Sequence, residues 1–264
     1  MIVIGEKLNS SIPATLAAMQ ARDTAAITDL ILSQQAGGAQ YLDINTAICQ
    51  EEELAVMQWV IALVKKNSSC GIMLDSPSTD VILGALDACE GRDVILNSVT
   101  LSERIDVLLP VAKQRGCGLV GLPIDASGMP QGAAGRVENA KALVSRMTEG
   151  GLSPDQIYID VLAEALAVGS ENAKHAIQAA SQLRALWPDI HIMCGLSNIS
   201  FGLPKRASVN TAFLAMMMAS GMDAAILDSA AGSMQLALHT CEALLGYDEF
   251  CMEYITYIRE QNEA

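Results

Sequence analysis

The sequence has 264 residues and a formal net charge of −14, which excludes a broad basic surface for nucleic acids and makes anionic membranes poor partners. It is 51% hydrophobic and 17% charged, and its seven cysteines form no CxxC pair, so we expect one α/β domain over residues 1–264 in a reducing cytoplasm. The first apolar run stops at Gly5-Glu6 and no run is long enough to span a membrane, so neither a signal peptide nor a transmembrane segment is predicted.

Short apolar segments alternate with helical patterns along the whole chain. Strands are predicted at 2–4, 40–44, 70–74, 93–96, 119–124, 156–159, 190–196 and 224–227. Helices are predicted between them at 24–35, 51–66, 79–89, 102–114, 136–148, 172–186, 209–220 and 233–245, with a surplus helix at 249–261. Eight such units match a (β/α)8 barrel of roughly 250 residues. An open doubly wound sheet is the alternative, but it favours a glycine-rich fingerprint after the first strand, where the sequence has Gly5-Glu6-Lys7.

Polar residues follow most of the predicted strands. They are Glu6, Asn9, Asp43, Asn45, Asp75, Asn97, Asp125, Asp160, Asn198 and Asp228. Any one of them could cap a helix or form a turn, and Asp228 and Asn97 fit that reading best. Asp75 and Asp160, in contrast, interrupt apolar segments, and buried carboxylates need hydrogen-bond donors. In a parallel barrel these residues share one cavity at the carboxyl ends of the strands.

The set lacks the residues of several common chemistries. No histidine stands at the carboxyl end of a predicted strand, which argues against a Ser–His–Asp site, and only Lys7 is a lysine after a strand. His191 and Cys194 have no further ligands around them, so no metal site is expected. The remaining Asp, Asn and Ser side chains suit a flat heterocycle with amino, N–H and carbonyl groups, such as a pterin.

Several short segments carry a family resemblance in the right order. They are Gly5-Glu6-Lys7-Leu8-Asn9, Leu42-Asp43-Ile44-Asn45, Leu74-Asp75-Ser76, Asn97-Ser98, Tyr158-Ile159-Asp160 and Gly195-Leu196-Ser197-Asn198. Together with the segment from Val209 to Met216, they resemble the corrinoid-dependent methyltetrahydrofolate methyltransferases, over Gly5 to about Phe250. That family includes the acetogen enzyme serving the corrinoid/iron–sulfur protein, and it is similar to the pterin-binding module of cobalamin-dependent methionine synthase.

The resemblance implies a pterin-binding TIM barrel that forms a homodimer and uses tetrahydrofolate or 5-methyltetrahydrofolate as substrate. It implies a corrinoid (cobalamin) carried by a separate corrinoid protein that docks over the barrel, and the chain has no DxHxxG motif of its own. The matching positions imply pterin contacts for Asp75, Asn97 and Asp160, a catalytic place near N5 for Asn198, and pocket positions for Ser197 and Arg206. Further pocket residues are expected at Glu6, Asn9, Asp43 and Asn45.

The implied reaction moves a methyl group between N5 and cobalt. When Co(I) attacks the N5-methyl group, a hydrogen bond from Asn198 to N5 stabilises the departing amine in the transition state. The reverse transfer, from methyl-Co(III) to tetrahydrofolate, is equally allowed and operates in demethylation systems. Departures from the acetogen pattern at Pro77 and at Pro123-Ile124-Asp125 leave the partner and the direction open.

Two other functions remain as alternatives. A dihydropteroate synthase would need an anion site, which Lys205-Arg206 could supply, but the sequence has Leu196-Ser197-Asn198 in place of a Ser-x-Lys pattern. The other alternative is a non-catalytic module that binds a pterin or a corrinoid protein.

Overall fold

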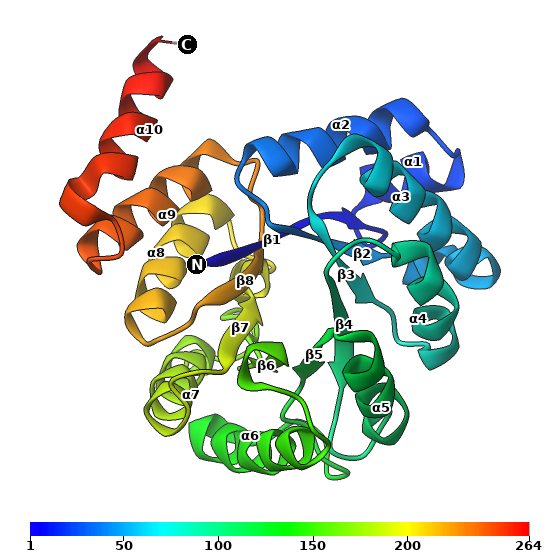
Figure 1. Cartoon of the computed structure of the whole chain (residues 1–264). Coiled ribbons are helices and arrows are strands. Elements are labelled where there is room, and N and C mark those ends of the chain that lie inside the picture. The colour runs from blue at the N-terminus through cyan, green and yellow to red at the C-terminus, as the bar shows by residue number, and fades with distance from the viewer. Residues whose placement is uncertain (264) are drawn as a thin grey trace.

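The computed structural model describes residues 1–263, and its eight strands form a closed barrel in which every neighbouring pair is parallel (Figure 1). The strands are β1 (Ile2–Asn9), β2 (Tyr41–Asn45), β3 (Gly71–Asp75), β4 (Val94–Val99), β5 (Gly118–Gly121), β6 (Ile157–Asp160), β7 (His191–Gly195) and β8 (Ala224–Leu227). Their order around the barrel follows the chain, and β8 closes on β1. The predicted (β/α)8 barrel is confirmed. The sequence predicts a single domain over residues 1–264, and residue 264 lies outside the described residues.

Helices surround the barrel and cover the outer face of its strands. They are α2 (Thr24–Ala36), α3 (Glu53–Asn67), α4 (Thr79–Leu86), α5 (Ile105–Arg115), α6 (Gly132–Glu149), α7 (Asn172–Leu186), α8 (Arg206–Ala219) and α9 (Gly232–Leu244). In α3, Val56, Val60 and Val64 recur every four residues and are buried against the strands. Glu53 in its first turn and Lys65 in its last turn complement the helix dipole.

The core has two parts because side chains alternate between the two faces of each strand. The outer part fills the layer between strands and helices. The inner part fills the barrel itself with Ile4, Met73, Ile95, Val120, Tyr158, Met193 and Ala224. The barrel interior is therefore a packed core, and open space for a ligand lies only beyond it, at the ends of the strands.

Two strand boundaries and one additional helix stand out among the differences from the sequence prediction. β1 continues to Asn9, well past the expected residue 4, because an irregularity in its pairing with β2 between Gly5 and Leu8 lets the strand extend. An additional helix, α1 (Pro13–Gln20), was not predicted, since it buries only Thr15 and Met19 and its sequence has no clear apolar period. β5 ends at Gly121 instead of residue 124, two residues before Pro123, which has no N–H for a ladder.

The interpretation of Asn97 and Asp228 as helix caps is wrong. The N-cap of α5 is Arg104, in the left-handed conformation with φ of 64°, and the N-cap of α9 is Ala231. Neither helix has a side-chain cap. Asp228 instead forms an ion pair with Lys7.

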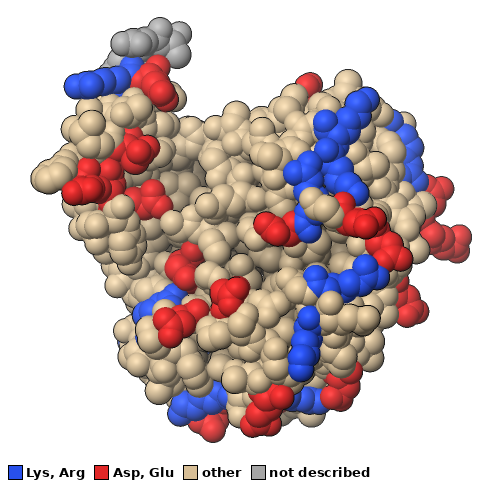
Figure 2. Space-filling view, in the orientation of Figure 1, with Lys and Arg blue, Asp and Glu red and all other residues tan. Residues whose placement is uncertain are grey.

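The surplus helix is present as a short 3-10 turn (Glu249–Cys251) followed by α10 (Met252–Glu263). α10 contacts α9 and stands out from the body of the molecule (Figures 1 and 2). Within residues 1–263, no helix is both long and apolar enough to cross a membrane. All seven cysteines are free and five are buried, as expected for small core residues.

Candidate active site

The inward-facing positions at the ends of the strands are polar. In β6, Tyr158 belongs to the packed interior, and Asp160, two residues further along, points to the same side. Four polar residues lie two positions after an interior apolar residue of the same strand: Glu6, Asp75, Asn97 and Asp160. The barrel therefore brings carboxylates and amides from separate strands to one opening, which we call the mouth.

On one side of the mouth, β2 and β3 hold a bonded amide–carboxylate pair. Asn45 and Asp75 are partners in the strand register, and Asn45 Nδ2 donates to Asp75 Oδ2 at 2.7 Å. Ser10 Oγ lies 3.3 Å from Asn45 Oδ1 and orients the amide. Burial raises the pKa of Asp75, and the hydrogen bond from Asn45 opposes that rise. Asn97, the next residue in register, has no side-chain partner among residues 1–263 and is available to a ligand.

Asp160 holds the opposite side of the mouth. Its Oδ1 accepts the Leu162 N–H at 2.7 Å, and the described residues give its other oxygen no hydrogen bond. Burial raises the pKa of Asp160 to about 6, against the opposing effects of the Leu162 N–H and the Arg136 charge. Asp160 is therefore mostly ionised at neutral pH and can accept bonds from two adjacent N–H groups.

Glu6 and its neighbours complete the ring between β1 and β8. Lys7 Nζ lies 2.7 Å from Asp228 Oδ2 and 3.6 Å from Glu6 Oε1. Burial raises the pKa of Glu6, while the Ser197 hydroxyl and the Lys7 charge oppose the rise. Asn9 is turned away from this group, because its Oδ1 accepts the N–H of Ser11 in a local turn.

Asp43 lies one layer below Asn45 and is 2% exposed. Its Oδ1 is buried with no hydrogen-bond partner among the described residues. Burial and the neighbouring charges of Asp75 and Glu6 raise the pKa of Asp43 well above its ordinary value. Asp43 therefore lies beneath the mouth, where its carboxyl group can be protonated, and does not line the opening itself.

The turn after β7, a 3-10 segment (Leu196–Ser200), presents Ser197 and Asn198. Asn198 is exposed and lies close over Gly195, where an added Cβ would come within 2.9 Å of its Nδ2. Glycine at 195 thus leaves room for the Asn198 amide. Arg206, at the start of α8, donates to Ser200 Oγ at 2.9 Å and to Ser197 O at 2.8 Å, so it braces this turn.

Three residues near the mouth were not predicted. Arg104 donates to Ser76 O at 2.6 Å. Burial lowers the pKa of Arg104, and the nearby Asp75 charge opposes that change. Glu53 accepts from Ser76 Oγ at 2.5 Å, and Arg136, buried near the start of α6, forms an ion pair with Glu164. In the sequence they are ordinary charged residues of helices and loops, and only the arginine soon after Asn97-Ser98 could have been noticed. The described chain holds no cluster of three His, Cys, Asp or Glu residues suited to a metal ion.

The fold and the mouth define a barrel enzyme whose polar set suits a flat nitrogen heterocycle. The chain belongs to the pterin-binding enzyme family, whose model matches residues 5–228. The resemblance drawn from the sequence motifs is thereby confirmed at the level of the family.

Known relatives are similar over most of the chain. A methylcorrinoid:tetrahydrofolate methyltransferase of Eubacterium limosum is 34% identical, over 98% of this chain and 97% of the relative. Methionine synthase of Mycobacterium tuberculosis is 31% identical over 86% of this chain, which corresponds to only 20% of that longer protein. A solved dihydropteroate synthase of Coxiella burnetii in complex with pteroic acid shares the fold, with a TM-score of 0.67, 18% identity and coverage of 92% of this chain and 94% of that one.

Proposed function

We propose that this chain transfers a methyl group between N5 of tetrahydrofolate and the cobalt of a corrinoid carried by a separate protein. The observation that carries the proposal is the opposed pair of carboxylates, Asp75 and Asp160, at one barrel mouth. Similarity along nearly the full length of the methylcorrinoid:tetrahydrofolate methyltransferase supports the choice of reaction.

The pterin ring is held by its polar edge. The 2-amino-4-oxo edge of a pterin offers adjacent N–H groups, and an ionised Asp160 with one free oxygen can accept them. Asp75, fixed by Asn45, and the unpartnered amide of Asn97 supply further acceptors and donors from the other side. Such bonds to charged groups contribute about 1.5–3 kcal/mol each, enough to set the orientation of the ring.

Asn198 acts at N5. Its amide is exposed on the turn after β7 and can donate a hydrogen bond to a nitrogen or accept one from it. When the methyl group leaves N5 for Co(I), the donated bond stabilises the departing amine, and N5 gains a proton. In the reverse transfer, N5 attacks the methyl group of methyl-Co(III), a proton leaves N5, and Co(I) departs with the electron pair.

The direction we propose is from the methylcorrinoid to tetrahydrofolate. The full-length relative carries that direction in its name. In this direction Glu6, whose pKa is raised by burial, can receive the proton that leaves N5.

The corrinoid protein docks on the rim of the mouth. Large apolar side chains are exposed on the loops that follow four different strands: Ile48, Met129, Val168 and Phe201. Val168 is 80% exposed and Phe201 70%. Apolar residues around a polar cavity suit a partner that must exclude water when it brings the corrinoid to N5.

The proposal also includes a homodimer, in which a second copy of the chain covers exposed apolar residues near the C-terminus. The end of α9, the segment after it and α10 expose a set of apolar residues, which we call the arm: Leu244, Tyr247, Phe250, Met252 and Ile255. Phe250 is 83% exposed, and none of residues 252–261 is buried. A helix of this length is marginal alone in water, and large apolar side chains exposed together mark a surface that a partner can cover.

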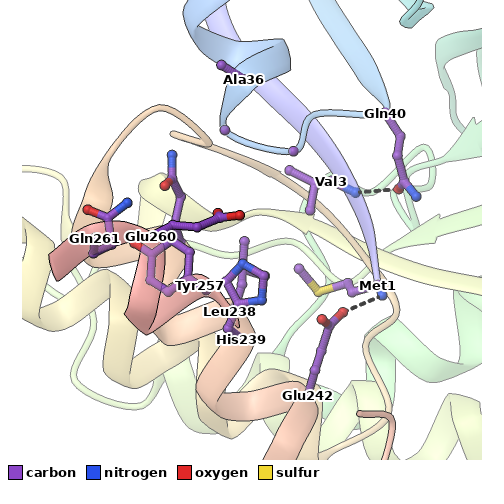
Figure 3. Close-up of a pocket in the computed structure, with 13 residues that line it drawn as sticks. Met1, Val3, Ala36, Gln40, Leu238, His239, Glu242, Tyr257, Glu260 and Gln261 are labelled. Carbon is purple, nitrogen blue, oxygen red and sulfur yellow. Dashed lines mark hydrogen bonds and ion pairs between the residues drawn. The ribbon is translucent and has the colours of Figure 1, made fainter. Parts of the chain in front are cut away.

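A hollow beside the arm gives a second copy a surface to fill. This cavity, of about 470 Å³, lies between α10, α9 and the loop after α2 (Figure 3). Tyr257 and His239 stack at its wall with ring centroids 4.5 Å apart. A protruding arm next to a hollow, present once on each chain, is compatible with a two-fold dimer.

Two experiments test the proposed function. Anaerobic mixing with methylcobalamin and tetrahydrofolate should produce the absorbance of Co(I), whereas incubation with p-aminobenzoate and a pterin diphosphate should yield no dihydropteroate. Formation of dihydropteroate would favour the synthase alternative, and pterin binding without transfer, even with a corrinoid protein added, would favour the non-catalytic module.

A further inference from the structure

An ion pair between buried Arg136 and half-buried Glu164 lies just behind the mouth, outside the set of residues assigned to the pterin. Arg136, near the start of α6, is 1% exposed and its Nη2 lies 2.5 Å from Glu164 Oε2. Its Nε and Nη1 are buried with no hydrogen-bond partner among the described residues. A charge buried in this way is costly unless it is paired, so removing Glu164 leaves the Arg136 guanidinium without compensation.

Glu164 belongs to the segment 161–171 between β6 and α7, which begins with a strained turn. Leu162 has φ of 60°, a left-handed conformation that a leucine keeps only where its surroundings hold it. In that conformation its N–H donates to Asp160 Oδ1 at 2.7 Å. Glu164 lies two residues after Leu162, so its ion pair with Arg136 fixes the turn that orients Asp160.

The same segment reaches the turn that carries Asn198. Leu166 N donates to Ile199 O at 3.0 Å, and Asn172 Nδ2 donates to Ala165 O at 2.9 Å. One short stretch of chain therefore connects Arg136, the Asp160 carboxylate and the segment of Asn198.

We propose that Arg136 is a positioning residue: through its ion pair with Glu164 it holds the segment 161–171 so that the Leu162 N–H meets Asp160 and aims that carboxylate at the pterin. This inference rests on the proposed function. Arg136 does not touch the pterin, and its effect on the reaction passes through Asp160.

Arg136 also acts on Asp160 through its charge. The groups that act on Asp160 are the Leu162 N–H on its own segment and the Arg136 guanidinium from α6; the Cys194 thiol of β7 lies in the outer core, and β5 contributes no titratable group. The Leu162 N–H and the Arg136 charge both lower the pKa of Asp160, against the effect of burial. Loss of Arg136 should therefore raise the pH above which Asp160 is ionised.

Two variants separate the effect of the Arg136–Glu164 ion pair from the effect of the Arg136 charge on Asp160. Arg136→Met removes both, so the affinity for 5-methyltetrahydrofolate, measured by calorimetry across pH 6, should fall at least about tenfold, and the midpoint of its pH dependence should move upward. Glu164→Gln removes the ion pair but keeps the Arg136 charge, so affinity should fall without an upward movement of the midpoint. Arg136→Lys should restore most of the affinity.

The control is an ion pair of the same type far from the mouth. Arg115 Nη2 lies 2.5 Å from Asp87 Oδ1 on the surface, so Arg115→Met should leave both affinity and midpoint unchanged. If Arg136→Met and Glu164→Gln fold, by circular dichroism, and bind the pterin with wild-type affinity and midpoint, the inference is overturned. Should Arg136→Met fail to fold, wild-type affinity in Glu164→Gln alone overturns it. Failure of the proposed function is a separate result, because the wild-type protein itself would then not bind the pterin.

Discussion

Replacing Asp160 with asparagine should make the protein more stable and a poorer pterin binder at the same time. Burial raises the pKa of Asp160 from 3.8 to about 6. Each tenfold change in acidity corresponds to about 1.4 kcal/mol, so the ionised carboxylate costs the fold up to about 3 kcal/mol. Because the folded-state pKa lies above the unfolded one, that cost is absent below pH 3.8, grows as the pH rises, and is complete above about pH 6.

Asparagine removes the charge and keeps an oxygen for the Leu162 N–H. Above pH 6, Asp160→Asn should therefore raise the free energy of unfolding by up to about 3 kcal/mol, or several degrees in Tm, and below pH 4 the gain should vanish. The second oxygen becomes an NH2 group that faces the pterin's own N–H donors. With about 1.5–3 kcal/mol for a hydrogen bond to a charged group, the Kd for 5-methyltetrahydrofolate should rise by roughly 10- to 100-fold.

Urea unfolding followed by circular dichroism at several pH values, with calorimetric titration of the pterin, measures both effects. Asp125→Asn is the matched control, since the Ser127 hydroxyl and N–H lower the pKa of Asp125, and its loss should not stabilise the protein. An Asp160→Asn protein that is no more stable than wild type above pH 6, or that binds the pterin equally well, would refute the account of this carboxylate.

Three further substitutions test other parts of the site and surface. Asn198→Ala should lower the rate of methyl transfer by roughly 100-fold with little change in pterin Kd, because removal of one transition-state donor typically costs about 2.7–4 kcal/mol; stopped-flow absorbance measures the rate, and an equal rise in Kd would point to ground-state binding instead. Asn45→Ala removes the 2.7 Å bond that opposes the raised pKa of Asp75, so the pH dependence of pterin binding should move upward; an unmoved titration profile would show that Asp75 does not control binding. Phe250→Ser should shift the mass measured by light scattering from dimer to monomer, whereas Val168→Ser, equally exposed but on the rim of the mouth, should not; a wild-type monomer would remove the arm as an interface.

The sequence was sufficient to predict the barrel and the residues of its mouth for one physical reason. Several strands are apolar runs that reach a polar residue near their carboxyl end, as in Ile72-Met73-Leu74-Asp75, and the alternation of side chains carries such residues to the inward face. In a closed parallel barrel all such ends meet. Asp75, Asn97 and Asp160 could therefore be placed together before the structure was known.

The contacts that tune those residues could not be predicted, because they join elements far apart in the chain. Asn45 bonds Asp75 only because β2 and β3 are in that register, and Arg136 approaches Asp160 only because α6 packs beside β6. The sequence likewise predicts Arg206 in the pocket but does not reveal that its guanidinium is bonded to the backbone and hydroxyl of the preceding turn.

The most direct test of the central claim follows the methyl group itself. Purified protein would be mixed anaerobically with tetrahydrofolate and cobalamin that carries an isotopically labelled methyl group, and the folate product would be analysed by mass spectrometry while absorbance reports Co(I). The account predicts that labelled 5-methyltetrahydrofolate and Co(I) appear together in equal amounts, and that Asp160→Asn suppresses both. If the wild-type protein binds tetrahydrofolate yet no label reaches N5, with free cobalamin or with a corrinoid protein, the claim that this barrel mouth transfers methyl groups is contradicted.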